Sequence, residues 1–260
     1  MKRDTGIAVR LLLAALLAVA SIGVAPDARA SELSIYSAGA VKAALGELAV
    51  NFEQASGHHL AIEYAPVGTL MRRLAEGHLP DIVILSADVM PEAVSKGWAA
   101  QASVTALGKS VIGVAVRQGA AVPDISTPEA FRQVLLDAKS ITYIDPAKGT
   151  SGKHLAEVLQ RLGIADAVKS KTTLGESGYV VEPVARGEIE LGIQQITEIL
   201  PVKGVTLVGP LPAALQKSTV YSAASTPASH DPAAVGSFLA YLRGDESREL
   251  FKRKGFTTPE

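Results

Sequence analysis

The stretch Pro80-Asp81-Ile82-Val83-Ile84-Leu85-Ser86-Ala87-Asp88 decides the fold class of this sequence. Its apolar centre, Ile82 to Leu85, shows no polar alternation, which is typical of a strand covered by helices on both faces. The small and polar residues after it indicate a turn at the carboxyl end of the strand. We therefore predict a buried strand that opens into a loop, the repeating unit of α/β proteins.

Apolar runs of the same kind alternate with amphipathic helix patterns along the chain. The first run, Leu33 to Tyr36, precedes a helix expected from about Ala40 to Ala55, whose apolar residues fall on one stripe. Three glycines stand where a helix would end in a left-handed residue: Gly57, Gly97 and Gly163. Further strands are expected at 111–116, 141–144, 191–193 and 205–208. The alternation predicts an α/β fold with largely parallel sheets.

The strand pattern is interrupted twice, near residues 107–113 and again near 209–218, where Pro210 and Pro212 separate two strand-like stretches. Two interruptions predict that the chain passes twice between two lobes. We expect residues 31–110 and 216–260 to form one lobe, residues 111–215 to form the other, and a ligand cleft to lie between them. A single continuous domain stays open as the alternative.

Residues 1–30 have the pattern of an export signal. Basic residues precede an apolar run from Leu11 to Val24, and the small residues of Ala28-Arg29-Ala30 flank a cleavage point. The run is short for a bilayer-spanning helix. We expect cleavage before Ser31 and a periplasmic product.

Composition excludes several classes of protein. The chain has no cysteine, which excludes disulfides, thiol catalysis and a lipid-modified N-terminal cysteine. With 25 Lys and Arg against 26 Asp and Glu, scattered along the chain, it is not expected to bind nucleic acid. Its five histidines lack the spacing of metal ligands, so neither a metal nor another cofactor is expected.

Small-residue turns follow several predicted strands, at the edge where open α/β sheets bind ligands. Backbone N–H groups at a helix start are unpaired and carry the positive end of the helix dipole, so they can hold an anion without a charged side chain. The alternative is that these residues only cap helices. The expected ligand-binding residues are Ser37, Ala38, Gly39, Ala40, Gly68, Thr69, Thr150, Ser151, Gly152, Ser177, Gly178, Tyr179, Gln194 and Gln195.

Two of these segments have an additional argument. The run Lys148 to His154 resembles a nucleotide phosphate loop but lacks its first glycine and the final Ser or Thr, so we read it as an anion-facing helix start. Gln194 and Gln195 end a short strand, and one of the two amides should point into the cleft and donate to an oxyanion. Helix capping or exposure to water is the equal alternative.

With these residues in view, the sequence resembles the molybdate-binding family of periplasmic solute-binding proteins, over essentially the whole chain after the signal. The resemblance is carried by Leu33 to Ala40, Gly68-Thr69-Leu70, Pro80 to Asp88 and Leu191-Gly192-Ile193. It implies a type II binding-protein fold of two lobes, joined by two crossings, that closes around a tetrahedral oxyanion. It also implies a single-chain receptor that delivers its ligand to an ATP-driven permease.

The sequence departs from the family where the ligand should lie. Ala40 and Gly68 stand at positions where the family has serines, and Gln195 stands where it has a tyrosine. The loss of hydroxyl donors weakens a site for molybdate or tungstate, at about 1 kcal/mol for each hydrogen bond that is not replaced. Compensation by Ser37, Thr69 and Thr150 and a roomier site for an organic carboxylate are both open.

The sequence supports two functions from different classes. The first is an anion receptor of an importer, which needs no catalytic residue. The second is an enzyme, because an aconitate isomerase, which moves a proton on a tricarboxylate, resembles the same family. That reaction needs a general acid or base near the ligand, and the sequence offers His154, Tyr179, Glu182 and Lys153 for it.

Overall fold

The computed structural model describes residues 30–259. All of the predicted export signal except Ala30 lies outside the described residues. Within them, no helix combines the length and the apolar character that crossing a bilayer requires.

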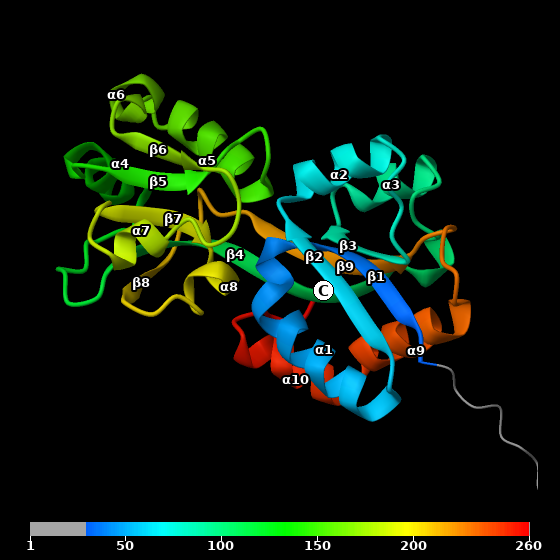
Figure 1. The fold of residues 1–260 in the computed structure, drawn as a ribbon. Helices are drawn as coiled ribbons and strands as arrows, with labels where there is room; N and C mark the ends of the chain where they lie inside the picture. The colour runs from blue at the N-terminus through cyan, green and yellow to red at the C-terminus, as the bar shows by residue number, and fades with distance from the viewer. Residues whose placement is uncertain (1–29, 260) are drawn as a thin grey trace, which may run out of the picture.

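The strands of residues 30–259 form one hydrogen-bonded path in the order β2-β1-β3-β9-β4-β7-β5-β6, with β8 paired to β4 (Figure 1). Their bounds are β1 Glu32–Ala38, β2 His59–Ala65, β3 Ile82–Ser86, β4 Thr105–Arg117, β5 Ile141–Ile144, β6 Thr172–Gly175, β7 Leu191–Gln195, β8 Val205–Pro210 and β9 Ser218–Ser225. The mixed α/β class predicted from the sequence is confirmed.

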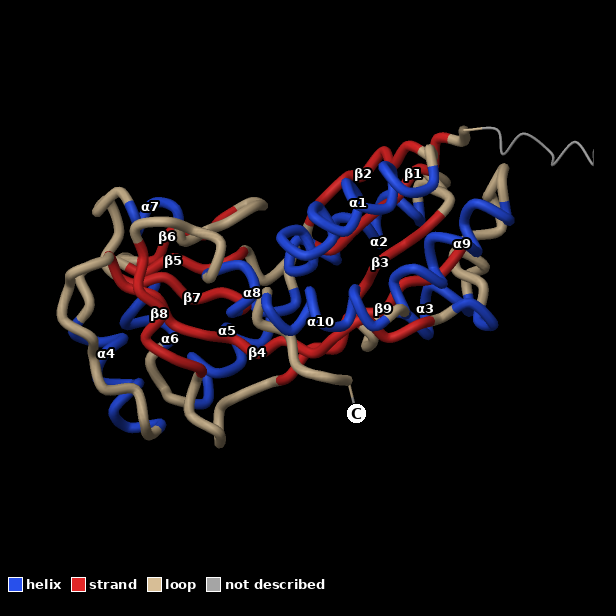
Figure 2. Tube along the Cα trace, turned by 90° about the horizontal axis from the view of Figure 1, so that it is seen from below, coloured by secondary structure: helices blue, strands red, loops and turns tan. Residues whose placement is uncertain are grey.

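The long strand β4 belongs to two groups of strands. Its residues 105–111 pair with β9, whereas residues 112–116 pair with β7 and residues 113–117 with β8. We call the strands β1, β2, β3 and β9 with the first part of β4 sheet A, and the strands β5 to β8 with its second part sheet B. Figure 2 shows β4 passing from one group to the other. The sequence placed this strand at 111–116 only and so missed its first half.

The expectation of largely parallel sheets holds only for part of the structure. The pairs β1–β2, β1–β3, β5–β6 and β5–β7 are parallel. The pairs that include β4 or β9 are antiparallel. The reason is that β4 leads from sheet A into sheet B and β9 leads back into sheet A, so the outgoing and the returning strand run in opposite directions.

Helices cover both faces of each sheet (Figure 1). On sheet A, α1, α9 and α10 pack together on one face, and α2 and α3 lie on the other. The helices that follow strands of sheet A are η1 Gly39–Val41, α1 Lys42–Ser56, α2 Val67–Ala75, α3 Met90–Ser95, η2 Gln101–Ser103, α9 Pro232–Arg243 and α10 Asp245–Arg253. Those of sheet B are α4 Pro128–Asp137, α5 Thr150–Arg161, α6 Ala165–Lys169, α7 Glu182–Ala185 and α8 Ile196–Ile199.

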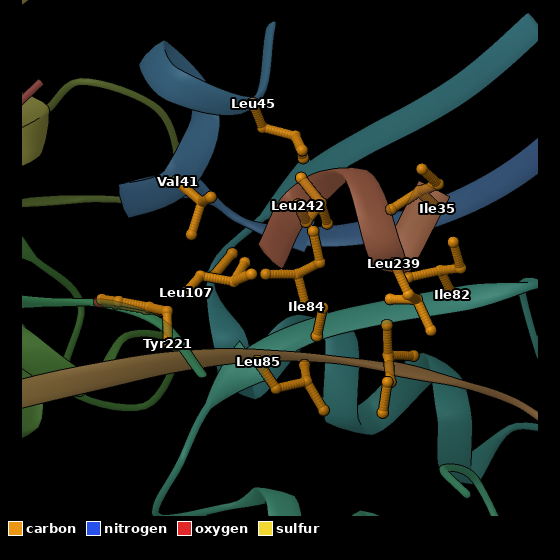
Figure 3. Close-up of a cluster of buried hydrophobic side chains, with 14 of the residues drawn as sticks. Ile35, Val41, Leu45, Ile82, Ile84, Leu85, Leu107, Tyr221, Leu239 and Leu242 are labelled. Carbon is orange, nitrogen blue, oxygen red and sulfur yellow. The ribbon is translucent and has the colours of Figure 1, made fainter. Parts of the chain in front are cut away.

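Because each sheet is covered on both faces, every residue of β3 is buried, as its uninterrupted apolar run predicts. The core of sheet A includes Ile82, Ile84 and Leu85 of this strand and extends to Leu239 and Leu242 of α9 (Figure 3). A second core of buried residues lies between sheet B and the helices α4, α5 and α6. The predicted helix-ending glycines are confirmed by positive φ angles: Gly57 76°, Gly97 72° and Gly163 67°.

Asp81, at the start of the deciding stretch, anchors sheet A. Its carboxylate accepts hydrogen bonds from the backbone N–H (2.8 Å) and the hydroxyl (2.7 Å) of Ser34 and from the N–H of His230 (3.1 Å). Burial alone raises the pKa of Asp81, but the bonds from Ser34 and His230 outweigh it, and the net pKa is lowered. The charged form therefore joins β1, β3 and the loop after β9.

Candidate functional site

The carboxyl ends of strands from both sheets meet at one place. In sheet A, β1 and β2 are parallel and end at Ala38 and Ala65. In sheet B, β5 and β7 are parallel and end at Ile144 and Gln195. All four of these residues line one cavity of about 220 Å³. Ligands of open α/β sheets bind at this kind of position.

Each sheet contributes one wall of the cavity. The wall from sheet A consists of Ala38, Gly39, Ala40, Lys42, Tyr64, Ala65, Pro66, Val67 and Tyr221. The wall from sheet B consists of Ile144, Gly149, Thr150, Ser151, Ser177, Gly178, Tyr179, Gln195 and Glu198. The two walls differ in chemistry, since the first is mostly small or apolar and the second carries hydroxyl, amide and carboxyl groups.

Four helical segments begin at this cavity, and none of them has a side-chain cap. Their N-cap residues are Ala38 for η1, Pro66 for α2, Gly149 for α5 and Gln195 for α8. In the described part of the chain only α4 and α9 have side-chain caps, so a missing cap alone does not mark the cavity. The cavity turns therefore do not serve as side-chain caps, and what they share is that helix starts from both sheets converge there.

Glu198 brings a carboxyl group into this cavity from the first turn of α8. Burial raises its pKa to about 8, although a hydrogen bond with the Gln194 side chain acts in the opposite direction. At neutral pH the protonated form predominates. Glu198 can therefore donate a hydrogen bond there, and it can exchange a proton close to physiological pH.

Three tyrosines add phenol groups to the lining. Burial and the neighbouring Tyr179 raise the pKa of Tyr64 to about 12. Burial, followed by Glu198 and Glu182, raises the pKa of Tyr179, and burial also raises that of Tyr221. All three phenols are protonated at neutral pH and can donate hydrogen bonds.

One cation, Lys42, lines the cavity in the described part of the chain. Its ammonium group lies 5.3 Å from the centre of the Tyr179 ring and 5.7 Å from that of Tyr64. Lys42 is exposed and comes from sheet A, whereas Tyr179 belongs to the opposite wall. The lysine thus adds positive potential at the rim of the cavity and a contact between the walls.

Nine of the residues expected from the sequence line the cavity together. They are Ala38, Gly39, Ala40, Thr150, Ser151, Ser177, Gly178, Tyr179 and Gln195. Of the amide pair, Gln195 is the one at the cavity; its Nε2 donates to Thr219 Oγ1 (3.2 Å), and its Oε1 has no hydrogen-bond partner.

The other five expected residues do not line the cavity. The Ser37 hydroxyl is fully buried, at 3.3 Å from the carbonyl oxygen of Ala38. Gln194 donates to the carbonyl of Gly178 (2.9 Å) and so holds the loop that carries Tyr179. Thr69 is the third residue of α2, and its N–H donates to the carbonyl of Pro66.

Two glycines among these five allow close approaches of the backbone. The Gly68 N–H donates to the carbonyl of Lys148 (2.8 Å), which joins α2 of sheet A to the loop before α5 of sheet B. A Cβ on Gly152 would lie 2.0 Å from the carbonyl oxygen of Ile144, so only glycine lets α5 pack this closely against β5.

The acid–base candidates other than Tyr179 do not line the cavity. His154 Nε2 lies 2.7 Å from the carbonyl oxygen of Leu215, in the segment between β8 and β9. Lys153 on α5 and Glu182 at the start of α7 are exposed. No group of three or more His, Asp or Glu that could hold a metal occurs in residues 30–259.

Sequence reasoning missed Glu198, Tyr64, Lys42 and Tyr221. Glu198 and Lys42 stand in the first helical turn after a strand end that the sequence did identify, so extension by one turn would have found them. Tyr64 lies within β2, where nothing in the sequence marks a ligand-facing position. Tyr221 comes from β9 and reaches the cavity only because β9 pairs with both β3 and β4.

Comparison with known proteins places this geometry in a family. A family model described as bacterial extracellular solute-binding protein matches residues 33–257. An aconitate isomerase from a Pseudomonas species is 35% identical over 229 residues, which cover 86% of each chain. The molybdate-binding protein ModA of Escherichia coli is 30% identical over 246 residues, covering 92% of this chain and 95% of that protein.

Solved structures agree with the fold. The periplasmic molybdate-binding protein of Azotobacter vinelandii superposes with a TM-score of 0.73 at 20% identity, covering 88% of this chain and all of that one (100%). The sulfate-binding protein SubI of Mycobacterium tuberculosis gives a TM-score of 0.70 at 18% identity, covering 88% of each chain. The resemblance to molybdate-binding proteins noted in the sequence is confirmed, and the chain belongs to the bacterial extracellular solute-binding protein family.

Proposed function

We propose that this protein is a periplasmic receptor that binds a small organic carboxylate in the cavity between sheets A and B and delivers it to an ABC permease. The observation that carries the proposal is the convergence of helix starts from both sheets on one cavity. The N-cap residues of η1, α2 and α5 line it, and none of these helices has a side-chain cap. Uncapped N–H groups at converging helix starts suit an anion.

Closure around the ligand is part of this proposal. Residues 31–110 with 216–260 act as one lobe and residues 111–215 as the other, so that the chain crosses between them within β4 and again between β8 and β9. The hydrogen bond from the Gly68 N–H to the Lys148 carbonyl and the contact of Lys42 with Tyr179 both span the cavity and support a closed form. Receptors of this kind act as single chains, released from a cleaved signal at residues 1–30.

The lining favours a carboxylate over a tetrahedral oxyanion. Ala40 and Val67 provide no hydroxyl, and the N–H of Gly68 is already used by Lys148. Ile144 and the tyrosine rings provide apolar surface for a carbon skeleton. A molybdate ion has no such skeleton and would leave this apolar surface without a partner, so the cavity is better suited to an organic acid.

Thermal-shift and calorimetric titrations test the proposal with molybdate, tungstate, sulfate, phosphate and a panel of di- and tricarboxylates. A ligand that binds only the folded state raises the melting temperature. We expect a shift with one or more carboxylates and a smaller or absent shift with the oxyanions. A selective shift with molybdate or tungstate would contradict the carboxylate assignment, and no shift with any of them would contradict the anion receptor.

A second candidate function is isomerisation of a tricarboxylate. It is favoured by Glu198, whose burial raises its pKa to about 8, within a cavity that also holds the protonated phenol of Tyr179. A general base works best when its pKa is close to the working pH. The 35% identity to an aconitate isomerase points the same way. In this reading Glu198 removes a proton from an allylic carbon and returns it to the other end of the shifted double bond.

Proton NMR of the purified protein with cis- and trans-aconitate separates the two functions. Interconversion that is lost in Glu198→Gln but kept in Glu182→Gln would establish the enzyme and overturn the pure receptor. Binding of trans-aconitate without interconversion would exclude the isomerase and support the receptor.

A further inference from the structure

Glu198 lies at the point where the two walls of the cavity meet. Its helix α8 follows directly after β7 of sheet B and packs against η1 of sheet A. A Cβ on Gly39 would lie 3.0 Å from Glu198 Oε1, so the carboxyl group rests against the first of the uncapped turns. Any anion held by the N–H groups of that turn is therefore a close neighbour of this carboxyl group.

No cation in the described part of the chain forms an ion pair with this carboxyl group. None of the ion pairs that join residues 30–259 includes Glu198. The ammonium group of Lys42 lies over the rings of Tyr64 and Tyr179 instead. An ionised Glu198 would therefore face a bound anion as an uncompensated like charge, which disfavours binding.

The surroundings of α8 contain few other titratable groups. The helix contacts β4, β7, β8, η1 and α1, and Gly255 after α10 also lies against it. The neighbouring Lys254 is paired with Glu47 (2.7 Å). The elements β7, β8 and η1 have no titratable side chain, whereas β4 has Lys109 and Arg117 and α1 has Lys42, Glu47 and Glu53. Of these, only Lys42 lines the cavity, and the other titratable groups there are the phenols of Tyr64, Tyr179 and Tyr221.

We propose that Glu198 is protonated when the anion is bound and donates its O–H to a ligand oxygen, so that binding above neutral pH takes up one proton. This proposal deepens the proposed function and depends on it for the ligand. A protonated carboxyl group is a donor as well as an acceptor, and it complements an oxygen-rich ligand without adding charge. Burial supports this protonation state, since it raises the pKa of Glu198 to about 8.

Calorimetry in buffers of different ionisation enthalpy measures the proton uptake. The probe is trans-aconitate, or molybdate if the screen selects an oxyanion, and the protons that the free probe binds at each pH are measured separately and subtracted. We expect almost no proton uptake at about pH 6.5, close to one proton per ligand at about pH 9, and a roughly tenfold rise in Kd between about pH 7 and pH 9. A probe that binds with the same Kd and no proton uptake at pH 9 would overturn the proposal while leaving the receptor intact.

Two variants test whether Glu198 is the group that takes up the proton. Glu198→Gln keeps an N–H donor without a titratable group, so we expect a Kd within a few-fold of the wild-type value at about pH 6.5 and less than a twofold change up to about pH 9. Glu182→Gln removes an exposed carboxylate outside the cavity and should keep the pH dependence of the wild type. If Glu198→Gln keeps it as well, another group carries the proton and the proposal is wrong.

A measurement without ligand tests the protonation state independently of any ligand. A carboxyl group whose pKa is raised on folding stabilises the native state below its unfolded pKa and loses this contribution as pH rises through its folded pKa. The melting temperature of Glu198→Gln minus that of the wild type should therefore increase between about pH 5 and pH 8. If the difference in melting temperature stays constant across that range, Glu198 is ionised in the folded protein and the proposal is wrong. If none of the screened anions binds, only the proposed function is contradicted, because this measurement needs no ligand.

Discussion

The two walls of the cavity present different chemical groups to the space between them. The wall from sheet A offers backbone groups at Ala38-Gly39-Ala40 and Pro66-Val67, and its polar side chains are Lys42 and the phenols of Tyr64 and Tyr221. The wall from sheet B offers the side chains of Thr150, Ser177, Gln195 and Glu198. Backbone donors are supplied by any small-residue turn, whereas side-chain donors depend on each residue type. From this difference we expect that, in the proposed receptor, sheet A supplies a general affinity for anions and sheet B sets the choice of ligand.

The largest effect should come from the backbone approach that positions the wall of sheet B. Gly152→Ala would place a Cβ 2.0 Å from the Ile144 carbonyl oxygen, so α5 must move away from β5. We expect a loss of about 3 kcal/mol in the free energy of unfolding, at the upper end for overpacking, together with weaker ligand binding. Urea denaturation measures the loss of stability, and calorimetric titration measures the loss of binding.

Gly236→Ala is the matched control, because this glycine is also inside a helix but a Cβ added to it would meet no atom within 4 Å. It should stabilise the protein by about 0.5 to 1 kcal/mol through helix propensity. Equal urea midpoints for the two variants would mean that the packing of α5 on β5 does not hold this wall.

A smaller loss in the free energy of unfolding should follow from removing the charge of Asp81, which joins β1 and β3 of sheet A. Asp81→Asn removes the charge that accepts three hydrogen bonds from Ser34 and His230, at a cost of about 2 kcal/mol at neutral pH. The pKa of Asp81 is lowered on folding, so its contribution is present above the usual pKa and is lost as pH falls through the folded value.

The difference in melting temperature between Asp81→Asn and the wild type should therefore shrink as the solution is acidified below about pH 4. Asp166→Asn, at an exposed site on α6, should show neither the loss nor the pH dependence. A difference that is independent of pH would mean that the charge of Asp81 is not what joins β1 and β3.

The next effect concerns ligand choice rather than stability. Thr150→Val removes a hydroxyl group from the wall of sheet B and keeps the shape of the side chain. We expect an increase in Kd of about fivefold, equivalent to about 1 kcal/mol for one hydrogen bond. Thr173→Val, on an exposed position of β6 outside the cavity, should leave Kd unchanged. An unchanged Kd in Thr150→Val as well would remove this hydroxyl from the ligand site.

The smallest effect should come from the one charged side chain on the wall of sheet A. Lys42 is exposed at the cavity rim, so Lys42→Met should raise Kd by about twofold at physiological salt and by more at low ionic strength. Titrations at two salt concentrations measure the difference. A larger loss than in Thr150→Val would reverse the comparison, because sheet A would then bind the ligand through a side chain.

The sequence predicted much of the fold because its signals are local. The apolar run Ile82 to Leu85 is a buried strand, and Gly57, Gly97 and Gly163 end helices with positive φ. The turns at Ala38, Thr150, Ser177 and Gln195 line the cavity, because a strand end followed by a helix start has a readable pattern. The length of β4 was not readable, since its first half is a strand only through its pairing with β9.

What the sequence determined by itself was therefore the set of α/β units and the small-residue turns that end them. Only the tertiary structure decided which turns meet, and that Gly68 contacts Lys148. It also decided that Gln195 and not Gln194 lines the cavity, and that the Glu198 carboxyl group lies there partly buried with a raised pKa. The physical reason is that strand and helix patterns depend on neighbours along the chain. Burial and protonation depend on groups that folding brings together from distant segments.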